Sequence, residues 1–247
     1  MIDIKNLCVS ASDKKILQNF SLSIPLGHVT AIMGPNGSGK STLANALAGH
    51  QDYQVSGVVD FKGSDLLALE AYERAEKGLF VAFQNPVAIP GVNNLFFMKT
   101  ILNAKRKREG LEPLDASDFM ALVEEKAALV GLDAKFWERS LNDDFSGGER
   151  KRNDILQMLL LEPDFMVLDE TDSGLDIDSM QLVANAINSL KSEQRSIVLI
   201  THYQRLLRYV QPDSIHVLMN GAIVKSSDKS LVEKLESEGY QWLQEIE

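Results

Sequence analysis

With 247 residues, of which 45% are hydrophobic, the chain is long enough for one large α/β domain that carries an inserted subdomain. Its formal net charge of −10 argues against nucleic acid as the main partner and gives no support for docking on anionic lipid, because both need a basic surface. The single cysteine, Cys8, excludes an intramolecular disulfide and cannot by itself hold an iron–sulfur cluster, which usually needs several thiolates.

The chain has no apolar run that approaches the length of a membrane span, and its N-terminus goes straight into strand-like sequence. We therefore expect a protein without a signal peptide and without direct membrane insertion, located in the cytoplasm.

The N-terminal region has the pattern of an antiparallel β arm that leads into a buried strand. Residues 1–9 and 20–24 alternate loosely between apolar and polar side chains. Pro25, Leu26 and Gly27 then turn the chain into residues 28–33, an apolar run of strand length.

The loop after this strand fits the phosphate-loop pattern, in which a glycine and any four residues precede Gly-Lys-Ser/Thr. Its members are Gly34, Pro35, Asn36, Gly37, Ser38, Gly39, Lys40, Ser41 and Thr42. Residues 41–49 follow with apolar side chains at helical spacing, so the loop joins a strand to a helix, as the pattern requires.

Glycines let successive backbone N–H groups of such a loop point at an anion, and the helix N-terminus adds partial positive charge. Lys40 is expected to reach the outer phosphates of a nucleotide, and the Ser41 hydroxyl to bind Mg²⁺. The alternative is a chance Gly/Ser turn, but the bare pattern arises in a chain of this length only on the order of once in a hundred. We interpret the loop as a nucleotide site.

Beyond the loop, the composition changes at the end of a strand. Residues 58–61 and 79–83 have strand patterns, and the second ends at Gln84. Between residues 86 and 162 the sequence predicts helices at 95–108 and 116–130 but no convincing strand. We therefore expect a helical subdomain, residues 86–162, inserted into an α/β nucleotide-binding core formed by residues 1–85 and 163–247.

A second phosphate-seeking helix N-terminus is predicted at Ser146, Gly147, Gly148 and Glu149. Ser146 and Glu149 have the spacing of a capping box, but capping does not explain two glycines in the first turn. Each glycine costs up to about 1 kcal/mol relative to alanine inside a helix. Close approach of an anion to the helix end explains both.

Polar residues follow the later buried strands, which are predicted at 165–168 and 196–200. Asp169 and Glu170 follow the first of these strands and His202 follows the second. Together with Gln84 they should meet at the carboxyl edge of the sheet, where open α/β folds bind their ligands.

At that edge, Asp169 would hold Mg²⁺ and Glu170 would orient the water that attacks the γ-phosphate. His202 would contact the γ-phosphate, and Gln84 would reach the metal or the water. The plain alternatives are a solvated acidic loop and an ordinary surface histidine. The remaining pattern predicts a hairpin from 215–219 and 222–224 around Asn220-Gly221, and an amphipathic tail from Ser230 with Leu231, Leu235 and Trp242 on one side.

Taken in order, the phosphate loop, Gln84, Ser146-Gly147-Gly148, Asp169-Glu170, residues 173–176 and His202 resemble an ABC-type ATPase domain, which is an α/β P-loop NTPase. The resemblance covers essentially the whole chain and implies ATP and Mg²⁺ as cofactors. It implies catalytic roles for Lys40, Gln84, Glu170 and His202, and metal ligands at Ser41, Gln84 and Asp169. It also implies an ATP-dependent head-to-tail homodimer in which each ATP lies between the phosphate loop of one subunit and Ser146-Gly147-Gly148 of the other, with Asp176 at the seam.

Four stretches, residues 83–92, 148–157, 169–178 and 201–205, resemble more narrowly the SufC family, the ATPase subunits of the Suf iron–sulfur cluster assembly machinery. This resemblance implies SufB and SufD scaffold proteins as partners, whose shape would change with ATP-driven dimerisation. Two alternatives are the ATPase subunit of a membrane transporter and a non-catalytic nucleotide-sensing module. The presence of Lys40, Ser41, Asp169, Glu170 and His202 speaks against the second of these.

Three smaller points stay open in the sequence. No aromatic residue occurs between Met1 and Asn19, where many ABC ATPases place one to stack on adenine, so base selectivity is undefined. Lys151 either pairs with Glu170 in the isolated subunit or belongs to a solvated basic turn. Residues 95–98 either contact a partner or form the core of the helical subdomain.

Overall fold

The chain folds into two compact units in the computed structural model, which describes residues 1–12, 14–202 and 204–246. Unit 1 comprises Met1–Gln84, Asp164–Thr171 and Lys191–Glu247, and unit 2 comprises Asn85–Pro163 and Asp172–Leu190. The sequence assigns residues 172–190 to the core, whereas the structure groups them with the helical unit. The reason is helix α6 (Ile177–Ser189), whose apolar face packs against helices α4 and α5 of unit 2.

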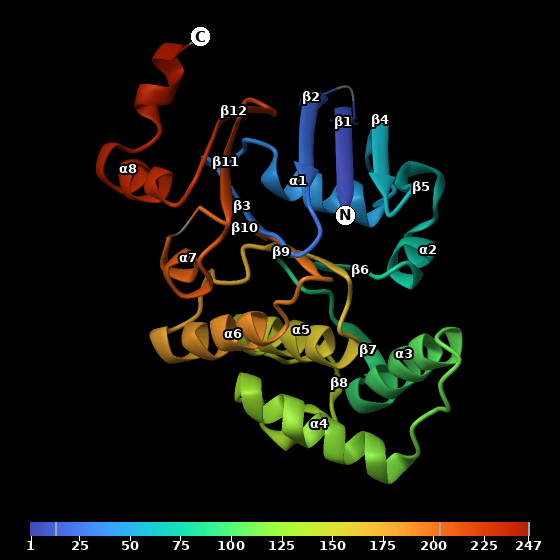
Figure 1. Cartoon of the computed structure of the whole chain (residues 1–247). Coiled ribbons are helices and arrows are strands. Elements are labelled where there is room, and N and C mark those ends of the chain that lie inside the picture. Colours follow the sequence, from blue (N-terminus) through green and yellow to red (C-terminus); the bar gives the residue numbers. More distant parts are fainter. Residues whose placement is uncertain (13, 203, 247) are drawn as a thin grey trace. The chain divides into compact units, whose positions relative to one another are not determined.

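The chain begins with three strands, and from β8 to β11 its strands and helices alternate (Figure 1). The strands are β1 (Ile2–Ala11), β2 (Lys14–Ile24), β3 (Val29–Met33), β4 (Gln54–Phe61), β5 (Ser64–Asp65), β6 (Leu79–Ala82), β7 (Ile89–Asn93), β8 (Ser140–Leu141), β9 (Phe165–Asp169), β10 (Ser196–Ile200), β11 (Ser214–Met219) and β12 (Ala222–Ser227). The α-helices are α1 (Lys40–Ala48), α2 (Ala71–Glu76), α3 (Asn94–Arg108), α4 (Ala116–Val130), α5 (Gly147–Leu161), α6 (Ile177–Ser189), α7 (Arg205–Val210) and α8 (Ser230–Glu238). Short 3₁₀ helices are η1 (Leu66–Ala68), η2 (Ala134–Phe136) and η3 (Gln241–Ile246).

Unit 1 contains a six-stranded sheet in the order β12-β11-β3-β10-β9-β6. Its strands are parallel except β12, which pairs antiparallel with β11. Every residue of β3, β9 and β10 is buried, because these central strands are covered on both faces. The predicted continuous apolar strands are therefore confirmed.

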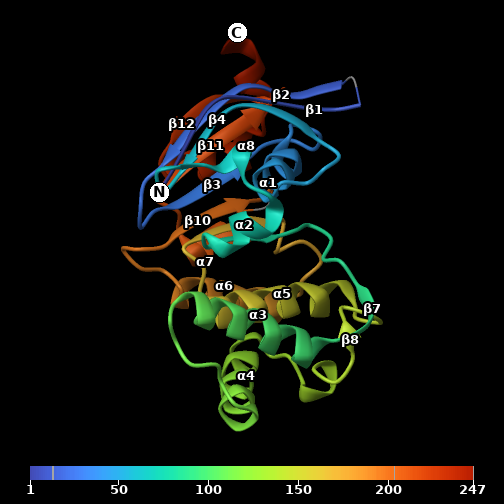
Figure 2. The ribbon, with the colours of Figure 1, turned by 90° about the vertical axis from the view of Figure 1, so that its right-hand side faces the viewer.

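A second sheet in unit 1 forms the predicted antiparallel arm, in the order β2-β1-β4-β5. Ile2 pairs with Ile24 on β2 and with Phe61 on β4, and the strand residues alternate between buried and exposed. Helix α1 lies between the two sheets (Figure 2), and its Leu43 belongs to the same hydrophobic core as Phe61 and Phe165. This core fixes the position of the phosphate loop, which leads directly into α1.

The predicted hairpin of β11 and β12 is present, and its turn has a glycine for a steric reason. Asn220 and Gly221 both have positive φ angles, 49° and 81°, as a two-residue hairpin turn requires. A Cβ atom at Gly221 would lie 2.2 Å from the carbonyl oxygen of Ile16 on β2. The turn is therefore pressed against the main chain of the arm.

Unit 2 contains α3, α4, α5 and α6 together with a two-stranded sheet, β7-β8. The prediction of no strand between residues 86 and 162 was wrong. Pro90 and Gly91, which indicate a break in the sequence, lie inside β7, and the ladder to β8 is irregular between Ile89 and Asn93. Such a short and irregular pair leaves almost no periodic signal in the sequence.

The C-terminal tail follows its prediction in part. Leu231 and Leu235 of α8 are buried, and so is Leu243 in η3. Trp242 is only partly buried and lies with its ring 3.9 Å from the ammonium group of Lys234. The residue that packs inward at this point is therefore the neighbour of the predicted one.

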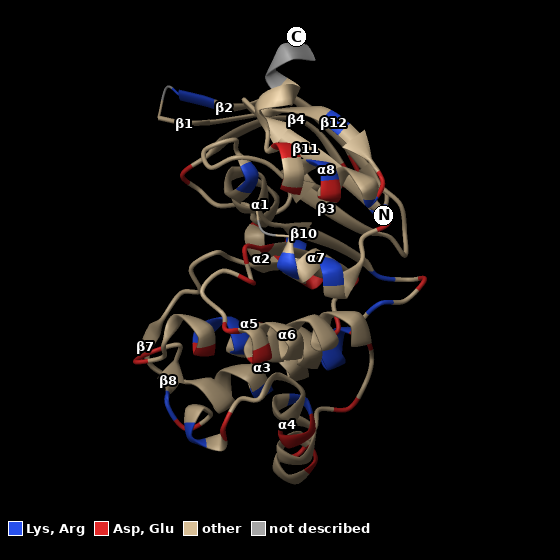
Figure 3. Cartoon of the chain, turned by 90° about the vertical axis from the view of Figure 1, so that its left-hand side faces the viewer, with Lys and Arg blue, Asp and Glu red and all other residues tan. Residues whose placement is uncertain are grey.

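Charges of both signs are spread over the chain. In the view of Figure 3, Lys and Arg lie among Asp and Glu along most elements. In the part of the chain that the structure describes, no helix is both long and apolar enough to cross a membrane.

Candidate nucleotide site

The order of the central strands brings the predicted site residues of unit 1 to one edge. The strands β3, β10, β9 and β6 are neighbours and run parallel, with Ile200 paired to both Ile32 and Asp169. The phosphate loop follows β3, His202 follows β10, Asp169 ends β9, and Gln84 follows β6. These groups therefore lie in a row along the carboxyl edge of the sheet.

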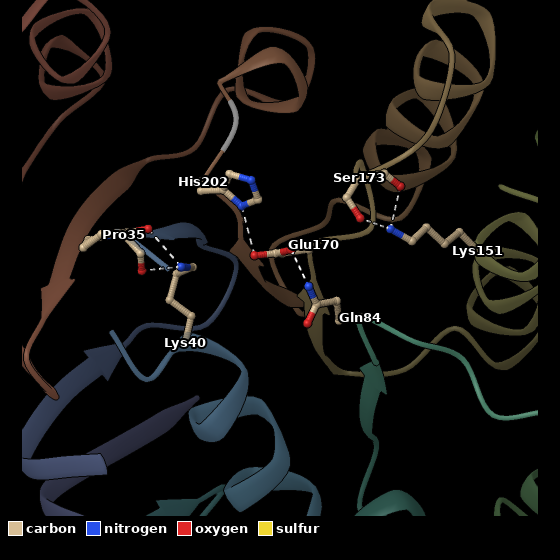
Figure 4. Close-up of polar contacts among 8 residues, drawn as sticks. Pro35, Lys40, Gln84, Lys151, Glu170, Ser173 and His202 are labelled. Atoms are coloured by element: carbon tan, nitrogen blue, oxygen red, sulfur yellow. Dashed lines mark hydrogen bonds and ion pairs between the residues drawn. The ribbon is translucent and has the colours of Figure 1, made fainter. Parts of the chain in front are cut away.

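Glu170 has two side-chain partners at this edge (Figure 4). Its carboxylate accepts a hydrogen bond of 2.7 Å from Nε2 of Gln84 at Oε2, and Nδ1 of His202 lies 2.9 Å from Oε1. Because an ionised carboxylate can only accept, Nδ1 of His202 is the donor. The side chain of Glu170 is 8% exposed, so little water reaches it.

The backbone of Glu170 is unusual as well. Its φ of 48° lies in the left-handed region, which costs a non-glycine residue roughly 1 kcal/mol or more. The N–H group of Glu170 donates to the carbonyl oxygen of Ile200 over 2.8 Å. This bond extends the β9–β10 pairing by one residue and turns the carboxylate toward Gln84 and His202.

The phosphate loop folds around the ammonium group of Lys40. Nζ of Lys40 donates to the carbonyl oxygens of Gly34 at 2.9 Å and Pro35 at 3.0 Å, and the residue is 5% exposed. Burial lowers the pKa of Lys40, whereas the carboxylates of Glu170 and Asp169 act in the opposite direction. The loop thus holds a buried cation at the place where the sequence predicts the outer phosphates.

Two glycines of the loop are required, Gly34 by close packing against the main chain and Gly39 chiefly by its backbone conformation. A Cβ atom at Gly34 would lie 2.1 Å from the carbonyl oxygen of Leu218, and one at Gly39 would lie 2.6 Å from Cδ2 of Leu17. Gly39 also has a φ of 107° and forms the N-cap of α1. Because a glycine N-cap has no side chain, it leaves the N–H groups of the first helical turn to a ligand.

The other end of α1 is held by a residue that the sequence analysis missed. Arg74 of α2 is buried, and its Nη1 donates to the carbonyl oxygens of Ala46 at 2.8 Å and Leu47 at 3.0 Å. Its Nε donates to Leu69 at 2.9 Å, and burial lowers the pKa of the guanidinium group. No motif marks this arginine, because its partners are main-chain carbonyls distant in the sequence.

The predicted capping box at the start of α5 is present in unit 2. The N–H group of Glu149 donates to Oγ of Ser146 at 3.3 Å, and Oε2 of Glu149 accepts from the N–H of Ser146 at 2.7 Å. Among the described residues, a Cβ atom at Gly147 would find no neighbour within 4 Å, and one at Gly148 would lie 3.4 Å from Leu175. Packing inside unit 2 therefore does not demand a glycine at position 147.

Other predicted site residues in unit 2 have local partners. Asp176 is the N-cap of α6 and accepts from the N–H of Ser179 at 2.7 Å, and the hydrogen bonds from Ser179 lower its pKa. Nζ of Lys151 donates to the carbonyl oxygen of Ser173 at 2.7 Å and to its hydroxyl (Figure 4). The pairing of Lys151 with Glu170 and the place of Asp176 in a dimer stay predictions. Tyr203, within the stretch 201–205, lies outside the described residues.

The donor groups at the edge suit a hard cation. Ser41 offers a hydroxyl, Asp169 a carboxylate that is 1% exposed, and Gln84 an amide oxygen, since its amide nitrogen faces Glu170. No cluster of three His, Cys, Asp or Glu residues exists in the described ranges that could hold a metal alone. This set fits Mg²⁺, which is usually bound by one or two carboxylates together with substrate phosphates and water.

The comparison with known families agrees with this arrangement. The family model described as ABC transporter matches residues 17–173, which include the phosphate loop, Gln84, the Ser146 cap and Glu170. The chain belongs to the ABC transporter family. It is an ABC-type ATPase with the α/β P-loop fold.

Two curated members of the ABC transporter family match this chain from end to end. The probable ATP-dependent transporter SufC of Escherichia coli strain K12 is 56% identical over 246 residues, which is 99% of each chain. The probable ATP-dependent transporter ycf16 of Cyanophora paradoxa is 50% identical over 248 residues, covering 100% of this chain and 96% of the relative. The chain therefore resembles SufC along its whole length.

Solved ABC cassettes share the fold at much lower identity. A dimeric post-hydrolysis structure of the ATP-binding cassette MJ0796 with ADP and Pi superposes with a TM-score of 0.79 at 22% identity, over 92% of this chain and 98% of that one. An ATP-binding subunit of an ABC transporter superposes with a TM-score of 0.78 at 20% identity, over 99% of both chains. The fold of the family is thus retained in this chain.

Proposed function

We propose that this chain binds and hydrolyses Mg–ATP as the motor subunit of an iron–sulfur cluster assembly complex, in which it changes the shape of a SufB–SufD scaffold. The observation that carries the catalytic part is the Glu170 carboxylate, held between Gln84 and His202 on the edge where the phosphate loop ends. The full-length identity of 56% to a relative named SufC supports the assignment to cluster assembly.

The phosphates of ATP would bind to the N–H groups of the loop 34–39 and of the first turn of α1, with Lys40 leaving its carbonyl partners for the outer phosphates. Ser41, Asp169 and Gln84 would hold the magnesium ion, which neutralises charge on the phosphate oxygens when it is bound. These residues bind and orient the nucleotide.

Glu170 would orient the attacking water, since its buried carboxylate is a hydrogen-bond acceptor at the end of β9. His202 and Gln84 fix the direction of this carboxylate. Because Nδ1 of His202 is used by Glu170, Nε2 is the nitrogen left for the γ-phosphate, and it would donate to a phosphate oxygen only when it also carries a hydrogen.

Unit 2 would complete the site in a second copy of the chain. The N–H groups at Gly147 and Gly148 begin α5, and the open space at Gly147 allows an anion to approach them. We assign Ser146, Gly147 and Gly148 to the γ-phosphate of an ATP bound by the other subunit, with Asp176 at the seam of the head-to-tail dimer.

The scaffold partner would contact the apolar residues exposed on unit 2. Phe96 is 70% exposed, Val87 66% and Ile89 39%, whereas Met98 is fully buried. The predicted cluster 95–98 thus divides into one exposed aromatic residue and one core residue. The exposed three lie in β7, in α3 and in the segment after Gln84, and they are the surface that we propose for the scaffold.

A membrane transporter is the second candidate, because the matching relatives are named probable ATP-dependent transporters. In that case the same apolar surface would contact an integral membrane subunit. The two candidates share the ATPase site and differ only in the partner.

The catalytic part is tested by Glu170→Gln. We expect ATP turnover to fall by about 100-fold or more, because a neutral amide is a weaker acceptor than a carboxylate and cannot act as a base toward the water. Nucleotide binding, measured by calorimetry with ADP, should persist. Glu162→Gln is the matched control, since Glu162 also has a left-handed backbone, with φ of 42°, and should keep full turnover. Unchanged turnover in Glu170→Gln would refute the catalytic proposal.

A further inference from the structure

Three asparagines are buried together inside unit 2. Asn94 and Asn153 are completely buried and Asn142 is 2% exposed. They come from the first turn of α3, the loop after β8 and the second turn of α5. Burying an amide is unfavourable unless its hydrogen bonds are made, so the partners of each one matter.

The three side chains form a continuous chain of hydrogen bonds. Asn94 and Asn153 bond reciprocally, with Nδ2 to Oδ1 distances of 2.9 and 3.3 Å. Nδ2 of Asn153 also donates to Oδ1 of Asn142 at 2.9 Å. Both amide hydrogens of Asn153 are therefore used within the network.

The network also bonds to two main-chain carbonyls and to the carboxyl group of Asp154. Nδ2 of Asn142 donates to Val87 at 3.0 Å, and Nδ2 of Asn94 donates to Phe136 at 3.3 Å. Val87 lies three residues after Gln84 in the chain. The network thus connects the segment that follows Gln84 to helix α5.

Asn142 also opens a strained turn that leads into the α5 cap. Asn142 and Asp144 have φ angles of 56° and 55°, so the turn before Ser146 contains two left-handed residues that are not glycine. Phe145 ends this turn, and its ring packs against Phe136 with centroids 4.9 Å apart. The side-chain hydrogen bonds of Asn142 therefore act on the backbone that sets the position of Ser146.

We propose that Asn94, Asn142 and Asn153 are positioning residues that hold the turn 142–145 so that the Ser146–Gly148 helix end can receive phosphate. The inference rests on the proposed function, because it gives that helix end a phosphate to bind. None of the three contacts nucleotide; they act through the turn.

Stability alone does not explain this arrangement. A buried, fully bonded amide contributes little net stability compared with a well-packed apolar residue. Three interlocked amides instead allow essentially one arrangement of the three elements, since any shift breaks several bonds at once. Fixed geometry at the Ser146 turn is what an anion site made of N–H groups needs.

The test uses the Glu170→Gln protein with Mg–ATP, in which dimer formation is measured by analytical ultracentrifugation. Asn142→Gly is added to it, because glycine adopts a φ of 56° without cost and removes only the side-chain bonds. We expect the dimer dissociation constant to rise by about tenfold or more. The reason is that each of the two ATP sites of the dimer loses hydrogen bonds that position the turn before its Ser146–Gly148 helix end. The dissociation constant of ADP should change by less than about twofold, because the phosphate loop lies in unit 1, away from the substituted residue.

Asn103→Ala is the matched control in unit 2. Asn103 also makes two side-chain hydrogen bonds, to the main chain of Leu114, but these lie outside the network. It should lower stability without changing dimer formation, which separates positioning from general stability. Asn142→Ser is the second variant if Asn142→Gly does not fold; its shorter side chain loses the bonds to Asn153 and Val87 without adding a carboxyl group beside Asp154, and it should weaken the dimer by about threefold or more.

The outcomes are distinguishable. If Glu170→Gln alone stays monomeric with Mg–ATP, the proposed function fails. If it dimerises and the Asn142 variants dimerise equally well, or if Asn103→Ala weakens the dimer as much, the positioning network is refuted while the proposed function stands.

Discussion

Glu170, the residue that carries the proposed chemistry, is both buried and strained in its backbone. Its φ of 48° is tolerated because the N–H bond to Ile200 and the two side-chain partners all favour one conformation. Gln84 and His202 are the groups that would also face magnesium and the γ-phosphate. Each would use a second atom for that contact, so both can keep their bond to Glu170 and hold its carboxylate in place while Mg–ATP is bound.

A second carboxyl group, Asp154 of α5, gives a prediction at the residue scale. Desolvation raises the pKa of Asp154 from 3.8 to about 7, against the opposing effects of its hydrogen bond with Asn142 and the charge of Lys151. The folded chain then binds more protons than the unfolded chain between these values, so the free energy of unfolding falls as the pH rises from about 4 to about 7. Asp154→Asn removes this fall.

The expected difference between Asp154→Asn and the parent chain grows by about 2 kcal/mol between pH 5 and pH 8, in favour of the variant. Urea unfolding at both pH values measures it. Two stability curves that run parallel over this range would contradict the proposed environment of Asp154.

At the element scale, the first turn of helix α5 contains a glycine that packing does not require. Gly147 lies in the first turn, where a Cβ atom would meet none of the residues described around it. Gly147→Ala should therefore keep the free energy of unfolding or raise it by up to about 1 kcal/mol, because alanine favours the helix. The same change should slow ATP turnover, because the methyl group would occupy the approach of the phosphate.

Urea unfolding and steady-state ATPase rates, measured on one preparation, test both halves of this prediction. Full turnover in Gly147→Ala would mean that no anion approaches the start of α5. A large loss of stability would instead mean that the glycine serves packing.

The elements that were predicted correctly share a local cause. The strands β9 and β10 are continuous apolar runs, the capping box at Ser146 and Glu149 has a fixed spacing, and the turn at Asn220-Gly221 has a specific composition. In each case neighbouring residues alone determine the structure.

The features that were missed depend on partners distant in the sequence. Arg74 binds carbonyls of a helix nearly thirty residues earlier, and the strand pair β7-β8 joins segments on opposite sides of α3 and α4. No signal in the sequence distinguishes Asn142 and Asn153 from ordinary polar residues, and only the folded structure shows that they are buried beside Asn94. A sequence pattern cannot report such contacts, because the distance between the residues differs in every case.

At the scale of the whole molecule, the two candidate functions differ in the partner that binds the apolar surface of unit 2. Val87, Ile89 and Phe96 are exposed in a chain whose net charge is −10, and the described part has no helix that crosses a membrane. We expect tagged protein purified from its native host to recover SufB and SufD. Phe96→Ser should reduce this recovery by about tenfold, because an exposed aromatic side chain that becomes buried against a partner contributes strongly to an interface.

Tyr72→Ser is the matched control, since Tyr72 is 66% exposed but lies on α2 in unit 1. Mass spectrometry of the co-purified proteins gives the result. Recovery of integral membrane permeases in place of the soluble scaffold would select the transporter.

The turn at Gly221 has a practical consequence for engineering this chain. Besides touching Ile16, Gly221 donates its N–H to the carbonyl oxygen of Ser38 at 3.1 Å and accepts from the N–H of Gln18 at 3.1 Å. A short surface hairpin near the C-terminus would usually be chosen for inserting a fluorescent reporter or an epitope. Here such an insertion would disturb the phosphate loop through its hydrogen bond with Gly221, so a reporter is better inserted elsewhere on the chain.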